Sequence, residues 1–213
     1  MIKAFFLLFE PAVTWDRIAL ARRGIFFILV TYLIPTLLLV GLAESWGLAT
    51  YGKWQPHYQK IRDFHLPAHQ SDILNFAIAQ FVLAIATVFI AALLIKIISG
   101  TFREEHNYRQ AFSTVAYSLS PLFLLRLLDV LPMVNPWMTW TFGIILAIWV
   151  FYQGLVRVML PDPTHAFGLY LSGLIVLVLT TGVARLFTAM YILGSMEFQH
   201  SWLSNKLGQW LGH

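Results

Sequence analysis

Hydrophobic residues in this chain gather in five long runs that short polar segments separate. The runs cover residues 24–43, 73–98, 112–131, 137–160 and 168–193. A helix needs ~20 apolar residues to cross the hydrocarbon core of a bilayer, and every run meets that length. A helix also satisfies its own backbone hydrogen bonds, as a lipid environment requires. The pattern therefore predicts an all-α, polytopic membrane protein with five transmembrane helices.

Shorter amphipathic segments flank the runs at both ends of the chain. Within residues 1–23, Pro11 suits the first turn of a helix that continues through Trp15 and Ile18. Residues 198–213 repeat apolar side chains at helical spacing. We expect both segments to form interfacial helices. No linker, internal repeat or low-complexity run divides the chain, which predicts one domain over residues 1–213.

Composition excludes several classes of site. Only 11% of the residues are charged, against roughly 25% in soluble domains. The chain has no cysteine, which excludes disulfides and thiolate metal sites. His65 and His69 have the i,i+4 spacing of a helical metal pair, but Pro67 between them breaks that geometry. We therefore expect no metal and no other cofactor. No basic run or helix face exists to track phosphates, so nucleic-acid binding is not expected.

The distribution of Lys and Arg predicts how the chain is oriented. With the N-terminus inside, the inner segments hold eight of these residues and the outer segments hold four. Cytoplasmic loops carry the excess of positive charge in membrane proteins. The N-terminus is therefore predicted to be cytoplasmic and, with five spans, the C-terminus lies on the opposite side.

Two prolines lie within the predicted spans, Pro35 in the first and Pro121 in the third. Each removes one backbone hydrogen bond and clashes one turn back, so each should bend its helix. Ser118 and Ser120 can donate to the carbonyls that Pro121 frees.

Charged residues within the spans form a candidate polar cluster. Arg126 and Asp129 are i,i+3 neighbours that share a helix face and can pair. Arg185, Gln80 and Glu44 lie at a similar depth on other spans. We hypothesise that Asp129 and Glu44 neutralise the two arginines between helices. Such a network either fixes the register of the helices or forms a site for a lipid headgroup or substrate.

The order of several short motifs resembles a known family, the Yip (Ypt-interacting-protein) domain in its bacterial inner-membrane branch. The motifs are Pro11…Trp15…Ile18, Tyr108…Phe112…Ala116-Tyr117-Ser118-Leu119-Ser120-Pro121, and Tyr152-Gln153-Gly154-Leu155 with Met159, Pro161 and Ala166. The resemblance implies that Pro11, Tyr117, Pro121 and Gly154 are structural signature residues. It also implies a multi-pass protein of the bacterial inner membrane, and the orientation predicted from Lys and Arg then makes the C-terminus periplasmic.

Eukaryotic members of this family are five-span proteins of Golgi and endoplasmic-reticulum membranes whose cytosolic N-termini engage Rab-type GTPases. Here the first span follows a region of about 23 residues without a long acidic arm. We therefore expect the fold and the membrane location to carry over, and not the GTPase-binding role.

The sequence favours a non-enzymatic scaffold or membrane-organising protein. Its expected partners are membrane lipids and other membrane or inner-face proteins, which the spans and the charged loop 99–110 would contact, and it could form a homo-oligomer. The alternative is a small-solute transporter or channel that uses Arg126, Asp129 and Arg185. A homodimer could then supply the even number of spans that transporters use. No nucleophile–base pair, phosphate loop or metal triad is present, and His106 beside Glu105 lies on a loop without further catalytic residues in its pattern, so we do not expect an enzyme.

Overall fold

The computed structural model describes residues 7, 10–21, 23–51, 70–102, 106–131 and 133–192. Some predictions therefore fall outside the described residues. They are the C-terminal interfacial helix at 198–213, the histidines at 65 and 69, and the charged positions 103–105 of the loop.

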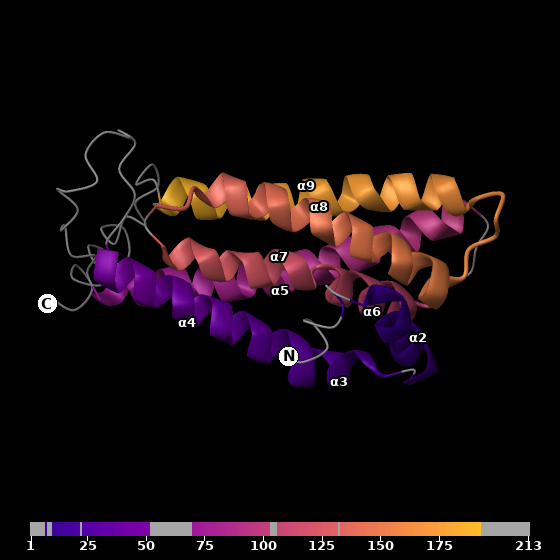
Figure 1. Ribbon diagram of the computed structural model, residues 1–213, viewed down its shortest axis with the longest axis horizontal. Coiled ribbons are helices and arrows are strands. Elements are labelled where there is room, and N and C mark those ends of the chain that lie inside the picture. The colour runs from indigo at the N-terminus through magenta and orange to yellow at the C-terminus, as the bar shows by residue number, and fades with distance from the viewer. Residues whose placement is uncertain are drawn as a thin grey trace, which may run out of the picture.

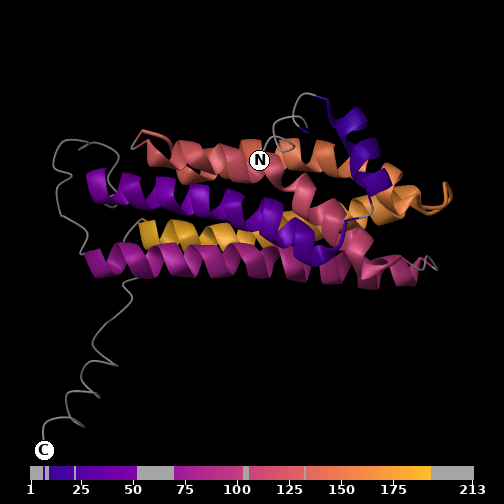
Figure 2. The ribbon, with the colours of Figure 1, turned by 90° about the horizontal axis from the view of Figure 1, so that it is seen from below.

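Five long helical segments run side by side along the longest axis of the molecule (Figures 1 and 2). In chain order they consist of α3 (Ile25–Ile28), η1 (Leu29–Leu33) and α4 (Ile34–Tyr51); α5 (Gln70–Thr101); α6 (Tyr108–Ser118), α7 (Ser120–Arg126) and η2 (Leu127–Val130); α8 (Pro136–Gly154) and η3 (Leu155–Met159); and α9 (Ala166–Ile192). All five are long and apolar enough to cross a membrane. The predicted all-α class with five spans is confirmed.

The shorter helix α2 (Pro11–Ala21) lies against one end of this bundle (Figure 1). We call this end, which also holds the start of α6, the α2 end. The opposite end, which holds η2 and the start of α8, is called the η2 end. The sequence predicts that the α2 end faces the cytoplasm, and this orientation stays a prediction.

The third span, formed by α6, α7 and η2, occupies the middle of the bundle. It is 72% buried inside the protein, whereas the other four spans are 28–44% buried. Its two α-helices pack against α4, α5 and α8. The polar residues of this span therefore face other helices, while the remaining spans present apolar side chains outward.

Local sequence explains where the third span begins and where it is interrupted. Asn107 caps α6 in a capping box with Gln110, whose Oε1 accepts from the Asn107 backbone N–H at 3.0 Å. The α-helix stops at Ser118 and restarts at Ser120, because Pro121 has no N–H to offer the Tyr117 carbonyl one turn back. The Ser120 hydroxyl donates to that carbonyl instead.

The first span also changes geometry next to its proline. A π-helical turn, Leu29–Leu33, covers the position one turn before Pro35 where the proline ring would clash. A second π-helical turn, Leu155–Met159, ends the fourth span at Leu160, which has a left-handed backbone conformation.

Candidate functional site

The five polar residues of the predicted cluster lie together near the η2 end. Glu44 comes from α4, Gln80 from α5, Arg126 from the end of α7, Asp129 from η2 and Arg185 from α9. Their exposed fractions are 12% for Arg126 and 2–7% for the other four. Buried charges are stable only when they are paired and hydrogen-bonded, so the contacts of each group decide what the cluster can do.

Arg126 joins the first three spans. Its Nε and Nη2 donate to the two carboxylate oxygens of Glu44, each at 2.9 Å, which is the bidentate geometry that suits a guanidinium best. Nη2 also donates to Oε1 of Gln80 at 2.9 Å, and the Thr188 hydroxyl of α9 donates to the same oxygen at 2.9 Å.

Arg185 joins the last span to the third and fourth. Its Nη2 donates to Oδ2 of Asp129, and its Nε donates to the Pro136 carbonyl at 2.9 Å. Thr139, in the first turn of α8, donates to Oδ1 of Asp129 at 2.6 Å. The two ion pairs and their neighbours thus tie all five spans together at the η2 end.

The pairing within the cluster differs from the simplest sequence expectation. Their spacing would allow Arg126 and Asp129 to pair with each other, yet each pairs with a residue of another span, as in the hypothesis that Glu44 and Asp129 neutralise the arginines between helices. The bidentate contact turns the guanidinium of Arg126 toward Glu44, and Asp129 is occupied by Arg185. Thr139 and Thr188 were absent from the sequence-based cluster. A single threonine in a span cannot be distinguished from an ordinary packing residue in the sequence. Its hydrogen bonds to the cluster become known only from its neighbours in the structure.

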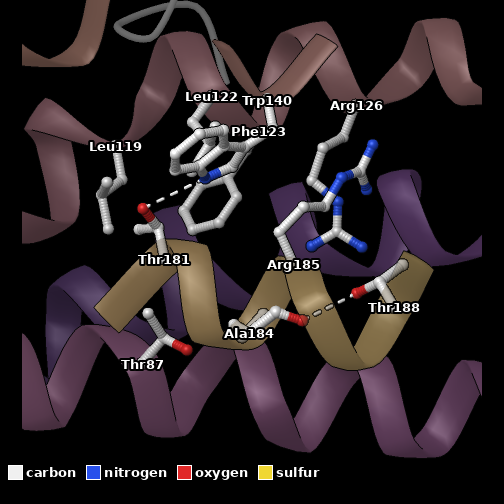
Figure 3. A pocket seen from close by; sticks show the side chains of 11 residues that line it. Thr87, Leu119, Leu122, Phe123, Arg126, Trp140, Thr181, Ala184, Arg185 and Thr188 are labelled. Carbon is white, nitrogen blue, oxygen red and sulfur yellow. Dashed lines mark hydrogen bonds between the residues drawn. The ribbon is translucent and has the colours of Figure 1, made fainter. Parts of the chain in front are cut away.

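A small cavity lies beside the cluster, between α5, α7, α8 and α9 (Figure 3). Both arginines line it, together with the Thr87, Thr181 and Trp140 side chains, and its volume is about 30 Å³. One water molecule needs roughly 10–15 Å³ of space measured in this way. Nη1 of Arg185 is buried and has no hydrogen-bond partner among the described residues. The cavity is therefore large enough for a water that accepts from Arg185.

The residues expected to be structural signatures take part in a second set of side-chain contacts, toward the α2 end. Trp15 of α2 is fully buried, and its Nε1 donates to the Val150 carbonyl of α8 at 3.1 Å. A Cβ atom at Gly154 would lie only 2.5 Å from Cζ2 of Trp15, so this glycine makes room for the indole. Residues 1–23 were expected to lie in the interface. The structure shows that α2 also inserts a side chain into the bundle, because the indole fills the space that Gly154 leaves.

Tyr117 and Pro121 belong to the same arrangement. The ring of Tyr117 contacts Trp15 edge-on at a centroid distance of 6.2 Å and lies 4.7 Å from the ring of Tyr32 in the first span. The Tyr32 hydroxyl is hydrogen-bonded to Oγ of Ser120, which in turn donates to the Tyr117 carbonyl. Pro121 directly follows Ser120 at the start of α7, and Pro11 begins α2 and is buried.

A comparison with known protein families identifies the family of the chain. The family model of the Yip1 domain matches residues 5–186, a range that includes α2, the first four spans and most of α9. The chain belongs to the Yip1 domain family. No curated protein and no solved structure matches it. The chain is thus a multi-pass membrane protein of the Yip1 family.

The described part of this Yip1-family protein contains no candidate metal centre. Within it, no group of three or more His, Cys, Asp or Glu side chains could hold a metal ion. His106 lies at the α2 end, where a ring nitrogen is 2.6 Å from the Met159 carbonyl, so its observed contact is with the backbone of the fourth span.

Proposed function

We propose that this protein is a non-enzymatic membrane scaffold that contacts lipids and other membrane proteins through a rigid bundle of five spans. The observation that carries the proposal is the contact pattern of the polar cluster. Two arginines and two carboxylates pair one to one, and they connect all five spans while leaving a cavity of about 30 Å³.

The alternative, a small-solute transporter, makes different demands on the same residues. Charged groups along a transport path face a water-filled cavity or change partners during the cycle. Here the guanidinium of Arg126 donates two hydrogen bonds to Glu44 and one to Gln80. The guanidinium of Arg185 donates to the Asp129 carboxylate and to the Pro136 backbone carbonyl. Breaking such buried pairs is expensive, which favours a structural role in a scaffold.

Reconstitution into liposomes tests the proposal directly. We expect proteoliposomes to retain trapped ions, sugars and amino acids as well as empty liposomes do. Mild purification followed by mass spectrometry should instead recover bound lipids and a stoichiometric protein partner or a second copy of the chain. Solute release that Asp129→Asn abolishes, while the variant remains folded, would overturn the scaffold proposal and favour transport.

A further inference from the structure

A second and larger pocket lies at the α2 end, between α2 and the ends of the third and fourth spans. Its volume is about 300 Å³, which is at the lower end of the range for ligand-binding pockets, roughly 300–1,000 Å³. Three arginines line it, Arg23 before α3, Arg109 in the first turn of α6 and Arg157 in η3. None of them belongs to the polar cluster at the η2 end.

Among the described residues, acidic side chains balance the positive charge of this pocket only in part. Nε of Arg157 lies 3.1 Å from Oδ1 of Asp16 on α2, and Asp16 is 63% exposed. Arg23 stacks over the ring of Phe27, with 4.5 Å between the guanidinium carbon and the ring centroid. Arg109 forms no ion pair with any described acidic residue. The pocket therefore offers a surplus of cationic groups to a negatively charged ligand.

The polar backbone at the start of α6 adds to this field. Asn107, Arg109 and Gln110 line the pocket, so it lies at the N-terminus of an α-helix of 11 residues. Asn107 caps the helix and its side chain accepts from the Arg109 backbone N–H, so what this end offers an anion is the partial positive charge of the helix dipole. Cations and helix dipole together match the chemistry of a phosphate group.

The position of the arginines along the spans indicates where the phosphate comes from. The spans run over Ile25–Tyr51, Tyr108–Val130 and Pro136–Met159, so each arginine lies within about two residues of a span end. This is the depth of lipid headgroups. Apolar side chains of Ile28, Val158 and Leu160 line the same pocket, and Leu160 is 74% exposed. A lipid could place its phosphate among the arginines and its acyl chains against the exposed Leu160, whereas Ile28 and Val158 are buried.

From these observations we infer that the pocket between α2 and the bundle binds the phosphate group of an anionic membrane lipid. The inference rests on the proposed function in that it names a lipid that the scaffold would contact. It assigns Arg23 and Arg109 as the binding residues, while Arg157 holds α2 in place through Asp16. Basic pockets between transmembrane helices recognise anionic headgroups in this way.

Lipid retention measured by native mass spectrometry tests the inference. The full chain would be purified in mild detergent and supplied with equal amounts of phosphatidylglycerol and phosphatidylcholine. The pocket variant R23Q/R109Q is compared with R17Q/K96Q, which removes the same charge from exposed residues of α2 and α5 outside the pocket. Each cation near a headgroup changes binding about fivefold, so the pocket variant should retain phosphatidylglycerol roughly 30-fold less. The control should retain it almost as well as the unchanged chain.

A charge-keeping variant guards against a folding defect. R23K/R109K should restore most of the retention, since lysine binds phosphate as a point charge. Equal losses in the pocket variant and the R17Q/K96Q control would overturn the inference, because the attraction would then come from the surface as a whole. If inorganic phosphate in neutral-lipid nanodiscs bound as tightly, with the same loss in R23Q/R109Q, a lipid source would be overturned. Solute flux would refute the scaffold proposal and leave this result unaffected, so the two failures are distinguishable.

Discussion

The charged side chains at the two ends of the bundle differ in their burial and in their pairing. At the η2 end, two arginines and two carboxylates are buried and paired, and the adjoining cavity holds about 30 Å³. At the α2 end, three arginines line a pocket of about 300 Å³, and among the described residues one exposed carboxylate, that of Asp16, pairs with one of them. A buried charge that is fully paired holds helices together, whereas a partly paired charge near solvent is available to a ligand. The same residue type thus serves structure at one end and, by our inference, recognition at the other.

The strongest test of this comparison is Asp129→Asn. It leaves Arg185 charged and buried without its counter-ion, which typically costs about 3–5 kcal/mol in the free energy of unfolding. Thermal unfolding in detergent, with the expression level, would measure the loss. The matched control is Asp16→Asn at the α2 end. If Asp129→Asn melted at the same temperature as the unchanged chain, the pairing at the η2 end would have no structural role.

A smaller loss is expected from Gly154→Ala at the other end. The added methyl group would meet the Trp15 indole at 2.5–2.8 Å, and such overpacking costs about 1–3 kcal/mol of stability. The control is Gly41→Ala, because nothing lies within 4 Å of that position. In a helix this control should gain up to about 1 kcal/mol, since alanine is the better helix former. Chemical unfolding of both variants measures whether the free energy of unfolding falls in Gly154→Ala and rises in Gly41→Ala. Equal changes in the two variants would contradict a close contact between Trp15 and Gly154.

Salt should separate the two kinds of ion pair. Asp16→Asn removes the exposed pair with Arg157, which should cost no more than about 1 kcal/mol and should cost less at 1 M salt. The loss caused by Asp129→Asn should hardly change with salt, because its partners are buried. Melting curves at low and high ionic strength provide the measurement. A salt-sensitive Asp129 pair would mean that water reaches the η2 cluster.

The smallest effect concerns Asp162, in the connection between η3 and α9. The backbone N–H and the hydroxyl of Thr164 both donate to Oδ1 of Asp162, and they hold the pKa of this carboxyl below its usual value of 3.8. A lowered pKa stabilises the fold above the usual pKa, and that contribution is lost as the pH falls through the lowered pKa. Asp162→Asn should therefore melt slightly earlier than the unchanged chain at pH 7, and the difference should shrink at pH 3. A difference in melting temperature that is the same at pH 7 and at pH 3 would exclude the ionisation of Asp162 as its cause.

The five spans could be predicted because each one is an uninterrupted run of apolar residues that is long enough to cross a bilayer. The apolar pattern placed the start of the third span at residue 112, whereas α6 begins at Tyr108. The difference arises because Asn107 and Gln110 form a capping box that extends the helix into polar sequence. The interruption near Pro121 was also predictable, since proline acts on its own helix through known local geometry.

The partners of the charged residues were less predictable. Depth along the spans grouped Glu44, Gln80 and Arg185 with the third span, because depth follows from counting residues. Which carboxylate each arginine contacts depends on how the helices are rotated and packed, and one sequence does not contain that information. The burial of Trp15 against Gly154 is likewise a contact between distant parts of the chain, 139 positions apart.

The hydrogen bond from Trp15 to Val150 has a consequence for how the protein is made. The two residues are 135 positions apart, and a ribosome adds about 5–20 residues per second. The indole is therefore synthesised roughly 7–27 s before the residue that accepts its hydrogen bond. During that interval α2 must wait at the membrane surface with its binding face uncovered, and it docks only after the fourth span has been inserted. Helix α2, which is synthesised before all five spans, is thus among the last described elements to reach its final position.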